Sequence, residues 1–330
     1  MKDFNQIPRV DISNSPTPLE KLPRLSNELG CHLFVKRDDC TGLAGGGNKA
    51  RKLEYLIADA QKKGADTLVT VGGFQSNHAR QTAAAAAKFG FGCELVLNDV
   101  EGTPKTDYYN NGNMLLDHLL GANIHTVPAN EERQAYVDAL LLELKKKGRK
   151  PYFVPLGGSS VIGCLGYVSC AHEILQQLNS QEIKIDQIIL ATGSAGTQAG
   201  LLAGLIAANS NIRVLGVSIM RPNNEQTHLV EHLLRETLEY LGIDPDLAKE
   251  KVFVNDSYYG KGYGITTPEM LTAVKRCAQR EGVLLDPVYT GKAMSGLIDL
   301  CEKGEIPAGS TQLFLHTGGS QGLYGYCEVF

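Results

Sequence analysis

The 330-residue sequence predicts an α/β protein built on parallel sheets. Short apolar runs typical of strands alternate with helix-like segments along nearly the whole chain, which is the order that parallel strands and crossover helices produce. Glycine-rich segments stand where predicted strands lead into predicted helices. Hydrophobic residues make up 43% of the chain and charged residues 21%, so there is enough apolar material for a large core.

The first half of the chain begins with an expected strand at 32–39 that runs into a loop. Amphipathic periodicity predicts a helix over 50–64, ended by Gly64, and an alanine-rich helix over 75–90, closed by Gly90. The other expected elements are strands at 66–73 and 93–99, helices at 107–120 and 131–148, and a strand with a turn at 151–158.

The second half repeats this rhythm. A helix is expected over 167–178, and the apolar run within 186–196 predicts a strand that ends in a glycine-rich turn. We find no internal repeat or linker that would interrupt the alternation. The other expected elements are a helix at 197–209, a strand at 212–220, helices at 223–242 and 267–282, a segment at 297–304, and a strand at 311–319.

The near balance of 32 basic and 36 acidic residues gives no electrostatic footprint for nucleic acid or an anionic membrane. No apolar run approaches the roughly eighteen residues of a membrane span, and the polar start MKDFNQIPRV lacks the apolar core of a signal peptide. We therefore expect a cytoplasmic protein with neither a nucleic-acid nor a membrane partner.

The eight cysteines are scattered along the chain, which favours reduced thiols over a disulfide framework. Cys164, Cys170 and His172 stand close in sequence, but no second cluster of ligands follows them. We expect no metal site there, only buried residues of a helix.

Glycine is unusually frequent, at 36 of 330 residues, and it gathers in six loops. Taken one at a time, each loop is better explained by a helix end or a tight turn. In open α/β sheets, however, ligands bind beyond the carboxyl ends of the strands, so loops in these positions are expected to converge on one cleft. The loops are 42–49, 71–77, 156–160, 191–200, 259–264 and 316–322.

The segment 188–208 has the chemistry of a phosphate cradle. The strand IILAT leads through GSAGT into a helix of small and apolar residues, which places backbone amides and two hydroxyls at a positive helix end. The segment is not the G-x-G-x-x-G of dinucleotide-binding proteins, and no acid stands where a ribose partner is expected. A nicotinamide-dependent dehydrogenase is therefore disfavoured.

Lys49 is a candidate amine nucleophile. Its loop GLAGGGNKA fails as a nucleotide-binding P-loop, because Asn48 stands where glycine is needed and Ala50 replaces the Ser or Thr that holds magnesium. A lysine at a helix start, near other cations, is less readily protonated and can form a Schiff base. The alternative is an ordinary exposed lysine.

Together these segments resemble the pyridoxal-phosphate (PLP) enzymes of the tryptophan-synthase β fold, or fold type II. Within them, the chain is similar to the branch that contains 1-aminocyclopropane-1-carboxylate (ACC) deaminase, D-cysteine desulfhydrase and L-cysteate sulfo-lyase. The resemblance covers nearly the whole chain. The motifs that carry it are SPTPLEKLPRLS, KRDDCTGLAGGGNKARKLEYL, QSNHARQTAAAAAK, GSAGTQAGL, GYGI, EGVLLDPVYTGKAMSGLIDL and HTGG.

The resemblance implies an architecture of two open, twisted, mostly parallel sheets flanked by helices. It places a large PLP-binding domain at 1–50 and 162–330 and a small inserted α/β domain at 51–161, with the active site between them. A small amino acid is the expected substrate, and a homodimer is the expected assembly.

The resemblance also assigns roles in cofactor binding. Lys49 becomes the Schiff-base lysine and the base that removes the α-proton of the substrate. Asn77 is expected to bind the 3'-oxygen of the PLP ring. The cofactor phosphate is expected on Ser194, Ala195, Gly196 and Thr197, with help from Lys52.

The substrate pocket implied by the resemblance starts at the QSN motif. Gln75, Ser76 and Asn77 are expected to bind the substrate carboxylate at a helix N-terminus. Tyr263 and Tyr289 are expected to flank the PLP ring and the substrate, with Tyr289 able to relay protons. For both tyrosines, the alternative is a role in the core.

Two positions beside the expected cofactor discriminate within the branch. ACC deaminases resemble one another in carrying Glu and Leu where this chain has Thr290 and Thr317. A neutral hydroxyl near the pyridine nitrogen leaves the ring a weaker electron sink, which suffices for expelling a good β leaving group. This departure favours the desulfhydrase and sulfo-lyase pattern.

The expected activity is therefore PLP-dependent β-elimination from a cysteine-like amino acid. Motifs such as KRDDCTGLA and GYVSCAHE favour L-cysteate sulfo-lyase, which yields pyruvate, sulfite and ammonia. The alternative is D-cysteine desulfhydrase, which yields hydrogen sulfide in place of sulfite. ACC deaminase and a non-catalytic ligand-binding protein are less favoured.

Overall fold

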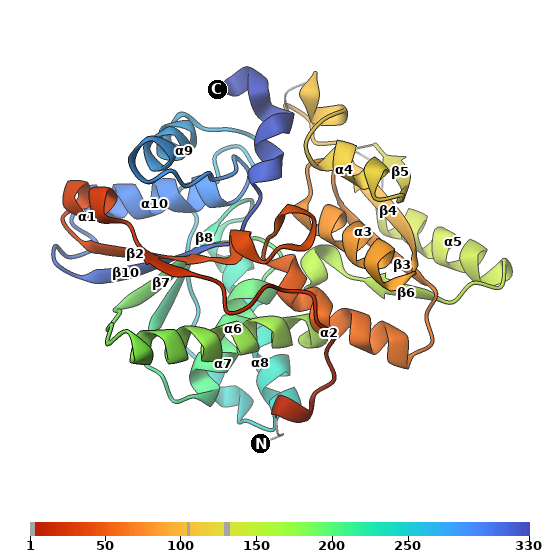
Figure 1. Cartoon of the computed structure of the whole chain (residues 1–330), viewed down its shortest axis with the longest axis horizontal. Coiled ribbons are helices and arrows are strands. Elements are labelled where there is room, and N and C mark those ends of the chain that lie inside the picture. Colours follow the sequence, from red (N-terminus) through yellow and green to blue (C-terminus); the bar gives the residue numbers. More distant parts are fainter. Residues whose placement is uncertain (1–3, 104–105, 129–132) are drawn as a thin grey trace.

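The computed structural model of the chain describes residues 4–103, 106–128 and 133–330 and contains two sheets flanked by helices. One sheet has six strands in the order β1-β2-β10-β7-β8-β9, and the other has four in the order β5-β4-β3-β6. Figure 1 shows the two sheets side by side, each with helices packed against it. The predicted α/β architecture with two mostly parallel sheets is confirmed.

The six-stranded sheet is parallel except at one edge, where β1 runs antiparallel to β2. In its centre, Phe314 of β10 is in register with Val35 of β2 and with Ile189 of β7. All three side chains are buried, as expected for a parallel sheet covered on both faces. The strands are β1 (Leu19–Lys21), β2 (His32–Arg37), β7 (Gln187–Thr192), β8 (Arg213–Ser218), β9 (Phe253–Asn255) and β10 (Thr311–His316).

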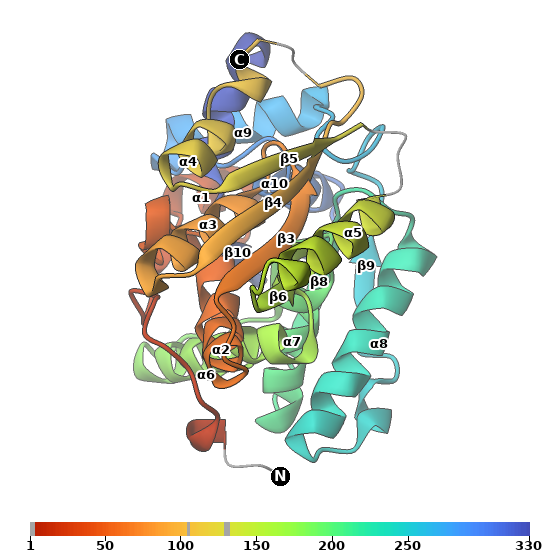
Figure 2. The same ribbon diagram turned by 90° about the vertical axis from the view of Figure 1, so that its right-hand side faces the viewer.

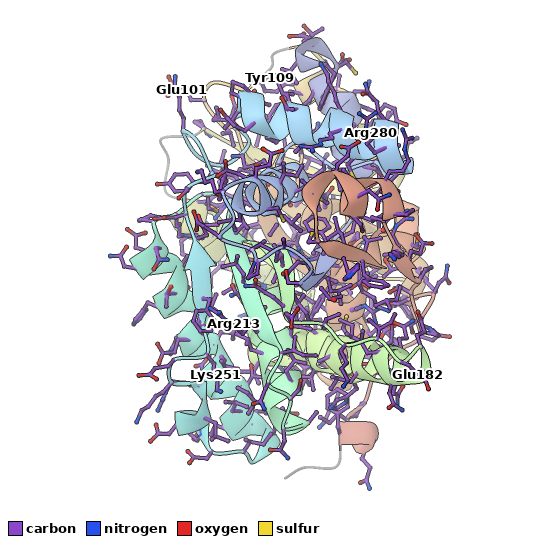
Figure 3. The ribbon with its side chains drawn as sticks, turned by 90° about the vertical axis from the view of Figure 1, so that its left-hand side faces the viewer. Glu101, Tyr109, Glu182, Arg213, Lys251 and Arg280 are labelled. Atoms are coloured by element: carbon purple, nitrogen blue, oxygen red, sulfur yellow. The ribbon has the colours of Figure 1, made fainter. Side chains whose placement is uncertain are left out.

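Helices cover both faces of this sheet and form two separate cores. One face carries α1 (Pro23–Leu29), α9 (Pro268–Glu281) and α10 (Thr290–Glu302), drawn above the sheet in Figure 1. The other face carries α6 (Val161–Ser180), α7 (Gly196–Ala207) and α8 (Asn223–Leu241). In Figure 3, Arg280 on α9 and Glu182, just after α6, mark the two sides of the sheet.

The four-stranded sheet is parallel throughout and consists of β3 (Thr67–Gly73), β4 (Gly92–Asn98), β5 (Asn123–Val127) and β6 (Pro151–Val154). Figure 2 shows this sheet with its flanking helices. A large core joins it to α2, α3 and α4, and a smaller one joins it to α5. These helices are α2 (Lys49–Lys62), α3 (Asn77–Phe89), α4 (Asn113–Leu119) and α5 (Arg133–Lys146).

Helix α2 packs closely on α6 and so ties the two sheets together. A Cβ atom at Gly166 of α6 would lie 2.2 Å from the backbone oxygen of Arg51, so only glycine allows the helices to approach this closely. The buried Arg51 side chain forms ion pairs with Asp38 and with Glu173 of α6. The start of α2, where Lys49 lies, is therefore held firmly.

Short 3-10 helices complete the chain and mark several loops. They are Phe4–Gln6, Asp38–Cys40, Leu43–Gly45, Asp107–Tyr109, Leu156–Gly158, Pro245–Ala248 and Ser320–Val329.

Several expected elements differ in extent. The single helix expected at 107–120 is wrong, because Gly112 adopts a φ of 58° and separates the 3-10 helix 107–109 from α4. Helix α6 is longer than expected at both ends, since the Ser160 hydroxyl accepts a hydrogen bond from the Gly163 amide and starts the helix there. Helix α10 begins seven residues before the expected 297. The expected helix 131–148 begins within the described residues at 133, and its first two positions lie outside them.

The strands β1, β5 and β9 and the helix α1 were not expected. Each is short, and three of the four lie at or beside a sheet edge, where the pattern of apolar residues is weakest. All strands of the four-stranded sheet fall within the predicted inserted domain 51–161, but its boundaries stay a prediction. Within the described part of the chain, no helix has the length and apolar character needed to span a membrane.

Candidate active site

The site lies at the carboxyl ends of strands from both sheets. A cavity of about 260 Å³ is lined by the ends of β3 and β4 on one side and by the residues that follow β7 and β8 on the other. A smaller cavity of about 30 Å³ shares Lys49, Gly193, Ser194 and Tyr289 with it. All six glycine-rich loops contribute residues to the two cavities, as their positions after strands predicted.

Lys49 is the first residue of α2, and its amine borders both cavities. The amine nitrogen Nζ donates a hydrogen bond of 2.9 Å to Oδ1 of Asn48. Burial lowers the pKa of Lys49 well below its usual value, and the nearby charge of Lys52 lowers it further. The lowered pKa favours the neutral amine, which is the form that acts as a nucleophile and as a base.

The turn after β7 is the segment for which the sequence predicts a phosphate cradle. Ala195 caps α7 with a φ of 69°, a left-handed conformation that is rare for alanine and turns the chain sharply into the helix. The Gly196 amide and the Ser194 hydroxyl both contact the Ser159 hydroxyl, at 3.1 and 2.9 Å. Thr197 accepts a hydrogen bond of 3.0 Å from the Asn48 amide. The turn thus presents a helix N-terminus and a group of hydroxyls.

Lys52 supplies the positive charge beside this turn. It lies one helical turn after Lys49, is fully buried, and donates hydrogen bonds to the Gly157 carbonyl and to Ser159, at 3.0 and 3.2 Å. A Cβ atom at Gly196 would lie 2.9 Å from the Lys52 amine, so glycine keeps the charge close to the turn. Burial lowers the pKa of Lys52 to about 8. A phosphate dianion beside it would favour the charged form and raise this pKa.

Ser76 and Asn77 lie at the N-terminus of α3. The Ser76 hydroxyl caps the helix by accepting a hydrogen bond of 3.2 Å from the Ala79 amide, and it borders the larger cavity. Asn77 borders the smaller one, and its carbonyl oxygen accepts hydrogen bonds from Arg80 and Asn113. This orients the Asn77 side chain so that its NH₂ group is left to donate.

Gln75 does not line either cavity. Its amide donates to the backbone oxygens of Tyr108 and Asn111, and its carbonyl accepts from the Asn113 amide. The structure thus uses the Gln75 side chain to hold the loop before α4, and its predicted substrate contact has no support from this geometry.

Tyr263 and Tyr289 meet at the larger cavity, from segments that are 26 residues apart. Their hydroxyl oxygens lie 2.5 Å apart, and their rings are edge to face. Burial raises the pKa of Tyr263 to about 12 and raises that of Tyr289 well above its usual value. Both phenols therefore stay protonated at neutral pH, and either can donate a proton.

Thr290 and Thr317 occupy different positions. Thr317 lines the smaller cavity, near Lys49. Thr290 lines neither, because its hydroxyl donates to Asp286 at 2.7 Å and accepts from the Asp286 amide at 2.8 Å. If Thr290 lies beside the pyridine nitrogen as predicted, its hydroxyl cannot donate to that nitrogen while its proton is bound to Asp286.

Four residues of this region were not expected from the sequence. Ser159 lies in one of the six glycine-rich loops, and Asp286 and His78 lie inside motifs that carried the resemblance. Burial raises the pKa of Asp286 and lowers that of His78 well below its usual value, so the imidazole is neutral. Arg133 also borders the larger cavity, but no local pattern around it indicated a site.

The donor set fits pyridoxal phosphate. The helix start, hydroxyls and buried Lys52 suit its phosphate, the free amide donor of Asn77 suits the ring oxygen, and the Lys49 amine suits its aldehyde. No Asp or Glu is among the residues lining either cavity in the described part of the chain, so nothing there repels the phosphate.

Residues 10–318 match the family described as "Pyridoxal-phosphate dependent enzyme". The chain belongs to this family. It is 44% identical to a D-cysteine desulfhydrase of Klebsiella pneumoniae over 326 residues, which cover 99% of this chain and 98% of the relative. It is 45% identical to a D-cysteine desulfhydrase of Serratia proteamaculans, over 97% of this chain and 96% of the relative.

A crystal structure of an ACC deaminase homologue superposes on this PLP-dependent enzyme with a TM-score of 0.89. The two are 41% identical, and the match covers 99% of this chain and 96% of the other. The predicted membership of the ACC deaminase and D-cysteine desulfhydrase branch is therefore confirmed, as is PLP as the cofactor. The predicted class, a PLP-dependent carbon–sulfur lyase, is confirmed at the level of this family.

Proposed function

We propose that this PLP-dependent enzyme releases hydrogen sulfide, pyruvate and ammonia from D-cysteine. The observation that carries the proposal is the identity of 44–45% with two D-cysteine desulfhydrases over 97–99% of the chain. This identity supports sulfide over sulfite as the leaving group, whereas the sequence motifs favoured L-cysteate. The cavity of about 260 Å³ has room for a small amino acid beside the cofactor.

Bound PLP supplies an electron-accepting ring that stabilises negative charge at the α-carbon of an amino acid. In the proposed reaction the Lys49 amine takes the α-proton, because burial lowers its pKa and so favours the neutral form that can accept a proton. The N-terminus of α3 at Ser76 receives the substrate carboxylate.

Departure of the sulfur is assisted by the hydroxyl pair of Tyr263 and Tyr289. Both phenols keep their protons at neutral pH, so Tyr289 can give one to the leaving sulfur and recover it from Tyr263. The aminoacrylate that is released hydrolyses to pyruvate and ammonia.

L-cysteate is the second candidate substrate. The observation that favours it is the presence of Arg133 and Arg221 among the residues lining the larger cavity, because a sulfonate requires positive charge at the β end of the substrate. The homodimer and the cytoplasmic location remain predictions.

A parallel assay tests the proposal. The PLP-loaded protein is offered D-cysteine, L-cysteate and ACC, and pyruvate, sulfide and sulfite are measured. We expect sulfide and pyruvate in equal amounts from D-cysteine. Sulfite from L-cysteate without sulfide from D-cysteine would contradict the proposal and restore the order expected from the sequence.

A further inference from the structure

The larger cavity has a strongly one-sided charge. Three basic residues, Lys49, Arg133 and Arg221, line it, and none of its lining residues in the described part of the chain is acidic. Lys49 is committed to the cofactor and cannot neutralise a substrate group. The two arginines are therefore the groups available to meet a charge on the substrate.

Arg221 is already engaged. Its Nη1 atom donates a hydrogen bond of 2.8 Å to the backbone oxygen of Gly193, and it lies 3.5 Å from the side-chain oxygen of Gln226. The Arg221 amide also donates to the Ser218 hydroxyl, which keeps the turn after β8 in place. Arg221 therefore positions the two turns that border the cavity, in particular the start of the phosphate cradle.

Arg133 is not engaged in this way. It is the first residue of α5 and is half-buried, yet within the ranges that the structure describes its guanidinium has neither a hydrogen-bond partner nor an ion-pair partner. Tyr263 is the group that interacts with it electrostatically, which places Arg133 near the end of the cavity that holds the tyrosine pair.

A partly buried guanidinium without a partner is unfavourable, because it has lost water without gaining a counter-charge. Its planar set of donors matches an oxyanion such as a sulfonate or carboxylate, which it can bind through two hydrogen bonds. The substrate α-carboxylate has its own position at the start of α3, so Arg133 is left for a second anionic group.

We propose that Arg133 determines the charge preference of the site by binding a negatively charged β substituent of the amino acid, such as a sulfonate. A thiol at the same carbon gains nothing from it. This inference rests on the proposed β-elimination and identifies the residue that decides between substrates with charged and uncharged β groups.

Two carboxylic acids without an amino group test the inference on the PLP-loaded protein. 3-Sulfopropanoate carries the second anion and butanoate does not, and neither can react with the cofactor, so calorimetric dissociation constants report binding alone. We expect the wild type to prefer 3-sulfopropanoate by about tenfold or more, as a charge-assisted hydrogen-bonded pair requires. R133A should reduce this preference to about threefold or less, and R133K should keep part of it.

Lys146→Ala is the matched control, because it removes one positive charge from the exposed end of the same helix. It should leave both dissociation constants unchanged. An equal loss of affinity for both acids in R133A would overturn the inference, since it would place the α-carboxylate on Arg133. A preference that survives in R133A, or is lost as much in K146A, would overturn it as well.

Turnover separates this inference from the proposed function. In R133A the ratio of kcat/KM for L-cysteate to that for D-cysteine should fall by about tenfold or more, for the same reason as in binding. If the wild type releases no sulfide from D-cysteine, the proposed function fails. The two dissociation constants can still be measured in that case, and they decide the role of Arg133 independently.

Discussion

The hydroxyl oxygens of Tyr263 and Tyr289 lie 2.5 Å apart at the wall of the larger cavity. The two residues belong to different motifs, and the loop before α9 and the turn before α10 bring them together. Because burial raises the pKa of both, this pair is a protonated, hydrogen-bonded unit throughout the neutral range.

Removal of the Tyr289 hydroxyl should slow turnover strongly. We expect Y289F to lower kcat by about 10²–10³, the usual contribution of a positioned proton donor, and Y263F to lower it less, because Tyr263 acts through Tyr289. The exposed Tyr324 is the matched control, and Y324F should keep full activity. Because the pKa of Tyr263 is about 12, its ionisation should not lower kcat between pH 6 and about 10. Steady-state kinetics of wild type and Y263F over this range should therefore show the same dependence on pH. A kcat for Y289F within threefold of wild type would exclude the proposed role.

Replacement of Lys49 should separate cofactor attachment from cofactor binding. K49A removes the amine but leaves Lys52 and the turn 193–197 in place, so PLP should still bind while turnover falls by at least about 10³. Borohydride followed by mass spectrometry should attach PLP to the wild type and not to K49A. Lys62→Ala, at the exposed end of the same helix, should behave like wild type. Attachment of PLP to another lysine in the wild type would refute the assignment.

Lys52 should make the stability of the apoprotein depend on pH. Its pKa is about 8 in the folded chain and about 10.4 in an unfolded one, so between these values the unfolded chain binds more protons. The contribution of Lys52 to the free energy of unfolding is therefore lowest below pH 8 and rises as the pH increases through this window. K52M should make the rise in melting temperature between pH 7 and about 10 smaller than in wild type. Part of the rise should remain, because burial also lowers the pKa of Lys292 to about 8.

The same comparison in the presence of PLP provides the control. The cofactor phosphate favours the charged form of Lys52, so the rise with pH should be weaker in the PLP-loaded wild type. If the melting temperatures of wild-type and K52M apoprotein change with pH in the same way, the lowered pKa of Lys52 is contradicted.

The buried ion pairs of Arg51 should contribute more to stability than an exposed ion pair. Its guanidinium lies 2.8 Å from Asp38 and 2.9 Å from Glu173, and removing it takes the ion-pair partner from the fully buried Asp38, whereas Glu173 keeps Lys36. R51A should lower the free energy of unfolding by about 3–5 kcal/mol. Arg9→Ala breaks a 3.8 Å contact to Glu54 from an exposed side chain and should cost at most about 1 kcal/mol. Urea denaturation measures the free energy of unfolding of both variants. Similar losses in R51A and R9A would contradict the larger contribution expected from the buried ion pairs.

The same cluster predicts the response to acid. Burial alone would raise the pKa values of Asp38 and Glu173. The charge and hydrogen bonds of Arg51, with smaller contributions from Lys36 at both and from Tyr167 at Asp38, outweigh it, and both pKa values are lowered. Their stabilising contribution is therefore complete above the ordinary values of 3.8 and 4.5 and is lost as the pH falls below them. In R51A the free energy of unfolding should therefore fall less steeply with decreasing pH in the acid range than in wild type.

The order of strands and helices and the six glycine-rich loops could be read from the sequence. Helix periodicity, caps such as Ser76 and stops such as Gly90 are local signals, carried within one or two dozen residues. The convergence of the loops followed from a general property of parallel sheets, in which the carboxyl ends of the strands share one edge. The position of Lys49, Ser76, Asn77 and the turn 193–197 around one site was therefore predictable.

The direction of individual side chains was decided only by the tertiary structure. Gln75 adjoins Ser76 in sequence but turns away to hold the loop before α4, and Thr290 adjoins Tyr289 but is bound by Asp286. Arg133 borders the cavity only because α5 packs against the four-stranded sheet with its first residue at that edge. Such directions depend on contacts between residues far apart in the chain, and a local pattern contains no information about those partners.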